Sequence, residues 1–240
     1  MVFSDTSANQ GIVQQTRSLM RVDSTQWPTA KIVASANNWL DRVTGFAIGA
    51  DHRFQWDDTN HTELPEATTN LVANQSDYSF LTDEQGNTIL TLVRVDMLQT
   101  SGGSDYIKLE LIDQSNIPYA LDEFYGTAGT PAYYDKIADN IVRLYPKPST
   151  NITNGLKLYF KRTPSYFTAS DTTKAPGVAP ILHRGFVIAA AYDGALTLGL
   201  ENLQALSVEM EKEERKMRDY FTARNHDASN VMTPKRIDYV

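Results

Sequence analysis

The stretch that decides the fold runs from Ile181 to Leu200 and reads ILHRGFVIAAAYDGALTLGL. Its apolar residues surround the helical wheel instead of forming one stripe: Leu182, Phe186, Val187, Ile188, Ala189, Ala190, Ala191, Leu196 and Leu198. A helix that is apolar on all sides is normally buried on most of them, so other segments must surround this one. Gly199 marks either a kink or the boundary with a second helix.

A second helix is expected to follow, with Leu203, Leu206, Met210, Met217 and Phe221 on one side. Its other side carries a dense run of charge, Glu209–Lys216, which reads EMEKEERK. Such a face is most often a solvated surface. In a ring-forming protein it lines a channel or meets a neighbouring subunit instead.

The N-terminal part of the chain predicts two more helices. The first spans about Asn9 to Val22, and Pro28 suits the first turn of the second. From Ala30 one apolar stripe continues at helical spacing: Ile32, Val33, Ala36, Trp39, Leu40, Val43 and Phe46. We expect this helix to end at Gly45 or Gly49.

Between the helical ends, residues 50–166 read as short strands and turns. The β-type runs are 53–56, 70–73, 78–81, 88–97, 106–112, 140–145 and 155–162. In the run 106–112, Tyr106, Lys108, Glu110 and Ile112 are expected to share one face of a single strand. Strands this short and evenly spaced favour an antiparallel sandwich or a small barrel.

The predicted fold class is therefore α+β, with a β domain inserted into a helical bundle. Residues 1–49 and 167–223 form the two parts of the bundle, and residues 50–166 form the insert. Residues 224–240 are polar, contain Pro234 and form an extended tail.

Composition and charge exclude several classes of protein. The chain has no cysteine, which rules out disulfides, thiolate metal sites and cysteine nucleophiles. No apolar run approaches the length of a membrane span, and the first residues predict no secretory signal. Residues 51–165 carry nine Lys/Arg against sixteen Asp/Glu, so the net charge of -7 belongs to the insert. An acidic surface repels phosphate and argues against a conventional nucleic-acid binder.

A search for catalytic groups finds no convincing constellation, and we predict neither an enzyme nor a cofactor. Asp57, Asp58 and His61 can be drawn as the metal site of a hydrolase, but a polar loop explains them better. The run Asp83–Asn87 resembles a fragment of a calcium loop yet lacks the alternating ligands and the closing glutamate, so it is interpreted as a hairpin turn.

Aromatic residues crowd the insert, which raises a second hypothesis of a ligand-binding module. Exposed rings on a sandwich stack on sugars, as in a glycan-binding tail or surface module. The favoured interpretation is core and cross-strand packing. The rings concerned are Trp56, Tyr78, Tyr106, Tyr119, Phe124, Tyr125, Tyr133, Tyr134, Tyr145 and Tyr159.

The layout as a whole resembles the head-to-tail connector proteins of tailed bacteriophages, also called adaptor or neck proteins, particularly those of short-tailed phages. The resemblance rests on short sequence segments, which follow one another along nearly the whole chain in the order seen in that family. They are 36–43 leading into 54–60, then 64–65, 75–78, 89–96, 131–134, 141–148, 156–160 and 180–183.

The resemblance implies a structural virion protein without catalysis. It implies a dodecameric ring around the DNA channel, with portal protein on one side and tail or nozzle proteins on the other. DNA passes through non-specifically, no membrane is involved, and the protein is made in the host cytoplasm and resides at the head–tail junction. The tail is expected to order on the portal or on a neighbouring subunit, with the contact residues Arg224, Pro234, Lys235, Arg236, Ile237, Tyr239 and Val240.

Overall fold

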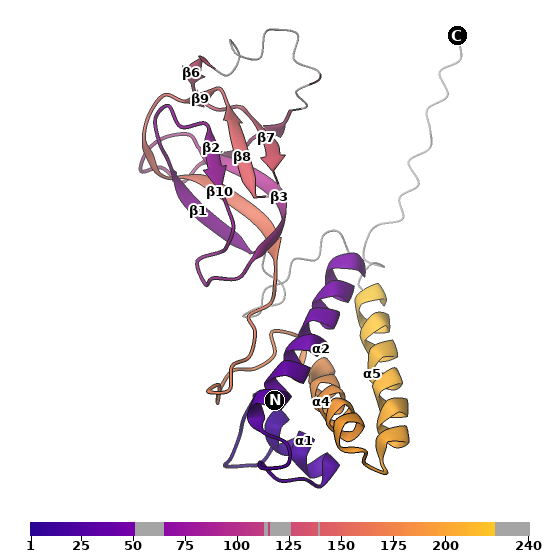
Figure 1. Cartoon of the computed structure of the whole chain (residues 1–240). Coiled ribbons are helices and arrows are strands. Elements are labelled where there is room, and N and C mark those ends of the chain that lie inside the picture. The colour runs from indigo at the N-terminus through magenta and orange to yellow at the C-terminus, as the bar shows by residue number, and fades with distance from the viewer. Residues whose placement is uncertain (51–64, 113–114, 116–125, 139, 224–240) are drawn as a thin grey trace, which may run out of the picture. The chain divides into compact units, whose positions relative to one another are not determined.

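The helices and the strands of the chain belong to two separate structural units. The structure, a computed structural model, describes residues 1–50, 65–112, 115, 126–138 and 140–223 (Figure 1). One unit comprises Met1–Phe54 with Phe167–Val240, and the other comprises Gln55–Tyr166. The fold is a mixture of helix and sheet, in agreement with the predicted α+β class.

One helix lies at the centre of the helical unit. The unit contains α1 (Ile12–Met20), α2 (Thr29–Ala50), α4 (His183–Leu198) and α5 (Leu203–Ala223), with a short 3-10 turn, η2 (Pro180–Leu182), before α4. Helix α4 contacts each of the other three helices and is seen between α2 and α5 in Figure 1. This position explains why its sequence is apolar on all sides. Gly199 adopts a left-handed φ of 65° and ends α4, so the predicted helix boundary at this glycine is confirmed.

Two glycines of α4 allow large side chains to approach its backbone. A Cβ atom on Gly185 would lie 2.8 Å from Nε1 of Trp39, which belongs to α2. A Cβ atom on Gly194 would overlap the Met20 thioether and lie 3.1 Å from Cε2 of Trp27. These distances are shorter than van der Waals contact, so only glycine fits at either position without repacking.

The segment before α4 is fixed to the N-terminal helices by paired interactions. The Asn37 side chain of α2 donates to the Phe167 carbonyl at 3.0 Å and accepts from the Phe167 amide at 2.8 Å. Phe3 stacks on Phe167 with ring centres 4.8 Å apart, and its amide donates to the Lys174 carbonyl at 2.7 Å. The chain thus returns from the β unit along a defined path beside α2 and α4.

Helix α2 continues through both glycines that were expected to end it. It runs to Ala50, past Gly45 and Gly49, so the predicted end point was wrong. Glycine in a helix interior costs about 1 kcal/mol relative to alanine, which weakens a helix without breaking it. The packing of the neighbouring residues Val43 and Ala47, both fully buried, outweighs that cost.

The β unit contains two four-stranded sheets and one short pair. The first sheet has the order β1-β10-β3-β4, the second β2-β8-β7-β5, and β6 pairs with β9. The strands are β1 (Glu66–Leu71), β2 (Asp77–Ser79), β3 (Ile89–Leu98), β4 (Tyr106–Lys108), β5 (Glu110–Leu111), β6 (Ala128–Gly129), β7 (Tyr133–Ala138), β8 (Ile141–Tyr145), β9 (Lys147–Pro148) and β10 (Ile152–Arg162). The predicted run 53–56 lies outside the described residues.

Both four-stranded sheets contribute to one hydrophobic core. Val95, Met97, Leu156, Leu158 and Phe160 come from the first sheet, and Tyr78, Val142 and Leu144 from the second. The two sheets remain separate in the part of the chain that the structure describes, so the closed-barrel alternative was wrong. Most pairs are antiparallel, but β5 pairs with β7 and β6 with β9 in parallel.

The predicted single strand 106–112 is divided between the two sheets. β4 pairs with β3, whereas β5 pairs with β7 of the other sheet. Leu109 lies between them, fully buried, and its amide donates to the Val95 carbonyl at 2.9 Å. Leu111, expected on the same face as Leu109, is 66% exposed. Side-chain alternation cannot reveal such a crossing, because each half keeps a period of two.

None of the described helices combines the length and the hydropathy needed to cross a bilayer.

Alanine substitutions at the two packed and the two open helical glycines should change stability in opposite directions. Alanine at Gly185 or Gly194 should lower the free energy of unfolding by about 1–3 kcal/mol, because its methyl group overlaps Trp39 or Met20. Alanine at Gly45 or Gly49 should raise it by about 0.4–1 kcal/mol, because a Cβ atom there meets no atom of the described residues within 4 Å. Urea unfolding of the four variants measures both effects. Equal changes in the two pairs would contradict the packing described here.

Candidate interaction surfaces

The tail residues proposed as contact sites lie outside the described residues. This applies to Arg224, Pro234, Lys235, Arg236, Ile237, Tyr239 and Val240, and also to the metal-site candidates Asp57, Asp58 and His61. Trp56, Tyr119, Phe124 and Tyr125 of the aromatic group are likewise outside them. The structure places other residues that the sequence analysis named, and it adds surfaces on the helical unit that the sequence did not single out.

The calcium-like run Asp83–Asn87 is a turn closed by its own aspartate. The Asp83 amide donates to the Asn87 carbonyl, and Asp83 Oδ1 accepts from the amides of Gln85 and Asn87 at 3.0 and 2.7 Å. Gly86 takes a φ of 84°, which glycine adopts without strain. The interpretation as a hairpin turn is confirmed. Across the described ranges, no group of three or more His, Asp or Glu side chains is arranged to hold a metal ion.

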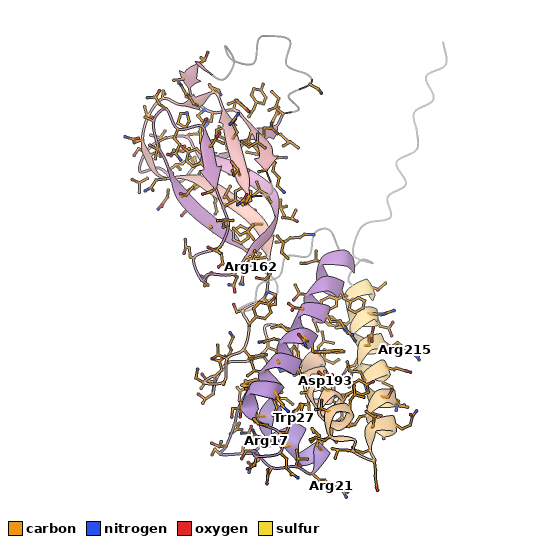
Figure 2. All side chains as sticks on the ribbon, viewed as in Figure 1. Arg17, Arg21, Trp27, Arg162, Asp193 and Arg215 are labelled. Carbon is orange, nitrogen blue, oxygen red and sulfur yellow. The ribbon has the colours of Figure 1, made fainter. Side chains whose placement is uncertain are left out.

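Asp83 also forms a buried ion pair with the end of β10. Its Oδ2 lies 3.1 Å from Nε of Arg162, and the two side chains are only 3% and 7% exposed. Arg162, which carries a label in Figure 2, has its charge enclosed within the β unit. Removal of one member of a buried pair leaves the other charge without compensation.

Substitution Asp83→Asn should therefore destabilise the β unit strongly. It keeps the volume of the side chain but removes the counter-charge of Arg162, and we expect a loss of about 3 kcal/mol. Denaturant unfolding followed by a β-unit probe measures this loss. Asp105→Asn, at an exposed position before β4, is the control and should change stability by less than about 0.5 kcal/mol. A loss no larger than that of the control would show that the ion pair is unimportant.

The charged run of α5 is organised into ion pairs that reach two other helices. Arg184 of α4 lies 3.9 Å from Glu209 and 3.7 Å from Glu213, and Arg42 of α2 lies 3.5 Å from Glu214. Along α5 itself, further pairs join Lys212 to Glu209 at 2.7 Å, Lys216 to Glu213 at 3.5 Å and Arg218 to Glu214 at 2.8 Å. The hydrogen bond from Lys212 lowers the pKa of Glu209. Arg215, labelled in Figure 2, is exposed on the same helix.

An apolar groove lies beside this network, where α2 and α5 end together. We call it the α2–α5 groove; it has a volume of about 300 Å³. Its described lining consists of Gly45, Phe46, Gly49, Arg218, Phe221 and Thr222. The Arg218 guanidinium carbon lies 4.9 Å from the centre of the Phe46 ring, so a cation borders the apolar floor. The sequence offered one signal for this site, the four-residue spacing of two glycines within an amphipathic helix, which we had interpreted only as a helix end.

A second depression lies between α1 and α4. It has a volume of about 430 Å³, and its rim carries Arg21 and Arg184 over the buried side chains of Val187 and Ile188. Arg184 already faces Glu209 and Glu213, which reduces its availability for another anion.

Four of the described tyrosines of the β unit are buried or lie beside a cation, whereas Tyr133 is 39% exposed. Tyr78 and Tyr145 belong to the core. On the outer face of the first sheet, the Lys157 ammonium lies 5.5 Å from the Tyr106 ring and 5.3 Å from the Tyr159 ring, and it pairs with Glu66 at 2.8 Å. The hydrogen bond to Glu66 raises the pKa of Lys157. The contacts of Tyr106 and Tyr159 fit the favoured interpretation of cross-strand packing.

A cross-strand ion pair joins β2 to β8 in the second sheet. Asp77 lies opposite Arg143 in the register, and its two oxygens accept from Nε and Nη2 at 2.6 and 2.8 Å. These hydrogen bonds lower the pKa of Asp77 below 3.8, its ordinary value. Because the folded carboxyl has the lower pKa, the stabilisation is complete above pH 3.8 and is lost as the pH falls through the folded value.

The variant Asp77→Asn should be less stable than the parent chain at pH 7 by about 0.5 kcal/mol, since the pair is partly exposed. The gap between the two proteins should close below pH 3.8. Urea midpoints measured from pH 7 to pH 2 test this, with Asp105→Asn run in parallel. A gap that persists unchanged at the acid end would rule out the ion pair as its cause.

Comparison with known proteins identifies a family for this chain. No match was found among curated proteins. The model of one protein family, described as SU10 adaptor protein, matches residues 10–238, which include both structural units and nearly all of the C-terminal segment. A match over almost the whole chain identifies the family, and the resemblance to phage adaptors stated from the sequence is confirmed. The chain belongs to the SU10 adaptor protein family, a family of bacteriophage adaptor proteins.

Proposed function

We propose that this protein is a head-to-tail adaptor that forms a ring between the portal and the tail of a phage particle. The observation that carries the proposal is the family match over residues 10–238, since an adaptor is a structural component of the virion. The protein acts by assembly and not by catalysis. Its partners are further copies of itself in a dodecameric ring, the portal protein, and tail or nozzle proteins.

The helical unit supplies surfaces suited to contacts between subunits. Leu196, Leu198 and Val208 are exposed around the turn that joins α4 to α5. The Asn202 side chain of this turn donates to the Leu19 carbonyl at 3.3 Å, and the exposed Leu19 side chain therefore lies at the same end of the unit. Apolar side chains exposed beside charged ones are typical of protein–protein interfaces.

The charge pattern of α5 suits a ring that encloses DNA. Its acidic and basic side chains largely neutralise each other through the ion pairs described above, and no excess of positive charge is available to hold phosphates. A wall of this kind lets DNA pass without retaining it. We place the helical unit around the channel and the acidic β unit at the periphery.

Residues 224–240 form the proposed contact with the portal. Arg224, Lys235 and Arg236 supply charge, and Ile237, Tyr239 and Val240 supply apolar anchors on either side of a single acidic residue. A segment of this composition gains its order from a partner and loses conformational entropy only on assembly. The site of action is the head–tail junction of the virion, after synthesis in the host cytoplasm.

Electron microscopy of the full-length protein mixed with portal rings tests the proposal. We expect an added ring layer of matching symmetry on one face of the portal. The control is a variant in which the order of residues 224–240 is scrambled, which keeps their length and charge. It should fold with an unchanged urea midpoint but leave the portal bare. Bare portals with the parent chain would refute the adaptor ring, and a layer formed equally by the scrambled variant would refute the role of the tail.

A further inference from the structure

The α2–α5 groove is open along the helix that forms its floor. Gly45 and Gly49 both face it, and a Cβ atom built on either would meet no described atom within 4 Å. Phe46 and Phe221 provide apolar surface, while Arg218 and Thr222 provide the polar rim. The groove therefore suits apolar side chains flanked by a polar or acidic group.

The position of the groove relative to the end of α5 favours one occupant. Phe221 and Thr222, in the last turn of α5, line it, and residues 224–240 continue directly from that turn. Their final part, SNVMTPKRIDYV (229–240), contains apolar residues on both sides of Asp238, namely Ile237 and Tyr239. Arg218 already pairs with Glu214 at 2.8 Å, but its side chain is 59% exposed, so Asp238 would share it; the apolar neighbours of Asp238 suit Phe46 and Phe221.

Chain length makes binding within the same molecule favourable. About 14 residues separate Ala223 from Ile237, and a flexible segment of that length has a typical end-to-end distance of about 20 Å. The corresponding effective concentration is in the millimolar range, which exceeds the concentration of any other copy in dilute solution. The segment is also long enough to reverse direction and return to the groove.

We propose that residues 231–240 occupy the α2–α5 groove of their own chain before assembly. This deepens the proposed function, on which its biological meaning rests. The anchors that contact the portal are held against the helical unit until the portal displaces them. Self-occupancy would also shield the groove from neighbouring copies and keep the free protein monomeric.

Cysteine cross-linking in the full-length chain tests the proposal directly, because the natural sequence contains no cysteine. The test variant carries Thr222→Cys at the rim of the groove and Thr233→Cys in the tail, which leaves Asp238 in place. The control carries Lys216→Cys with Thr233→Cys; Lys216 lies on α5 about 9 Å from Thr222 along the helix, within reach of the tail, and is not among the described residues that line the groove. Both variants are oxidised at low micromolar concentration without portal and separated under non-reducing conditions.

The expected result is an intramolecular disulfide that forms roughly tenfold faster in the test variant than in the control. Adding Gly45→Leu or Gly49→Leu, which fills the groove, should reduce the rate to that of the control. Circular dichroism and urea midpoints establish that the filled variants fold. Both groove-filling substitutions are made, so that if one variant does not fold, the other still tests the proposal.

Two outcomes would overturn the proposal. Equal intramolecular rates in the test and control variants would mean that the tail has no preferred position. A disulfide-linked dimer as the main product would mean that the groove takes the tail of a second copy. The outcome is independent of the adaptor assignment, because docking on portal rings is scored separately: the Gly45→Leu chain keeps its tail and should still dock.

Discussion

The helical unit depends on the close approach of large side chains to the backbone of α4. Trp39 lies over Gly185, and Met20 with Trp27 lies over Gly194, so α2 and the α1–α2 region are in contact with the central helix at two positions. These positions are nine residues apart, or about 13 Å along the helix axis. Since α4 comes from the C-terminal part of the chain, the two ends of the sequence can fold only together. In sequence, the β unit is inserted between the two parts of the helical unit.

The sequence predicted the helices well because buried helix faces are apolar, and apolar residues at helical spacing can be recognised in the sequence. The all-round apolar pattern of residues 181–200 requires surrounding helices, and the stripe from Ile32 to Phe46 supplies one of them. The end of α2 was mispredicted, because glycine propensity is a local quantity of about 1 kcal/mol that tertiary packing overrides. The crossing at Leu109 was missed for a different reason. Strand periodicity records which face is buried but not the sheet to which the strand belongs.

The candidate sites divide in a similar way. Composition suggests the tail as a contact segment, since isolated apolar anchors in a polar segment are visible without a structure, and this stays a prediction. The turn at Asp83–Asn87 was also predictable, but its ion pair with Arg162 was not, because it joins residues far apart in sequence. The α2–α5 groove required three-dimensional information for the same reason. Its residues come from positions 45–49 and 218–222; the glycine spacing in the first stretch indicates only a helix end on the sequence alone, and the second stretch carries no signal of a site.

The four helical glycines show how a cost in stability can be related to function. Each lowers helix stability by about 1 kcal/mol relative to alanine. At Gly185 and Gly194 the cost is offset by the contacts of Trp39, Met20 and Trp27, which a side chain would exclude. At Gly45 and Gly49 the described structure offers no such compensation, since a Cβ atom would touch nothing. A glycine that lowers helix stability without allowing closer packing is expected where the surface has a functional role, such as binding. The open pair lies beside the end of α5, where the segment proposed to carry the assembly contacts begins, and this placement supports the proposed link between the groove and assembly.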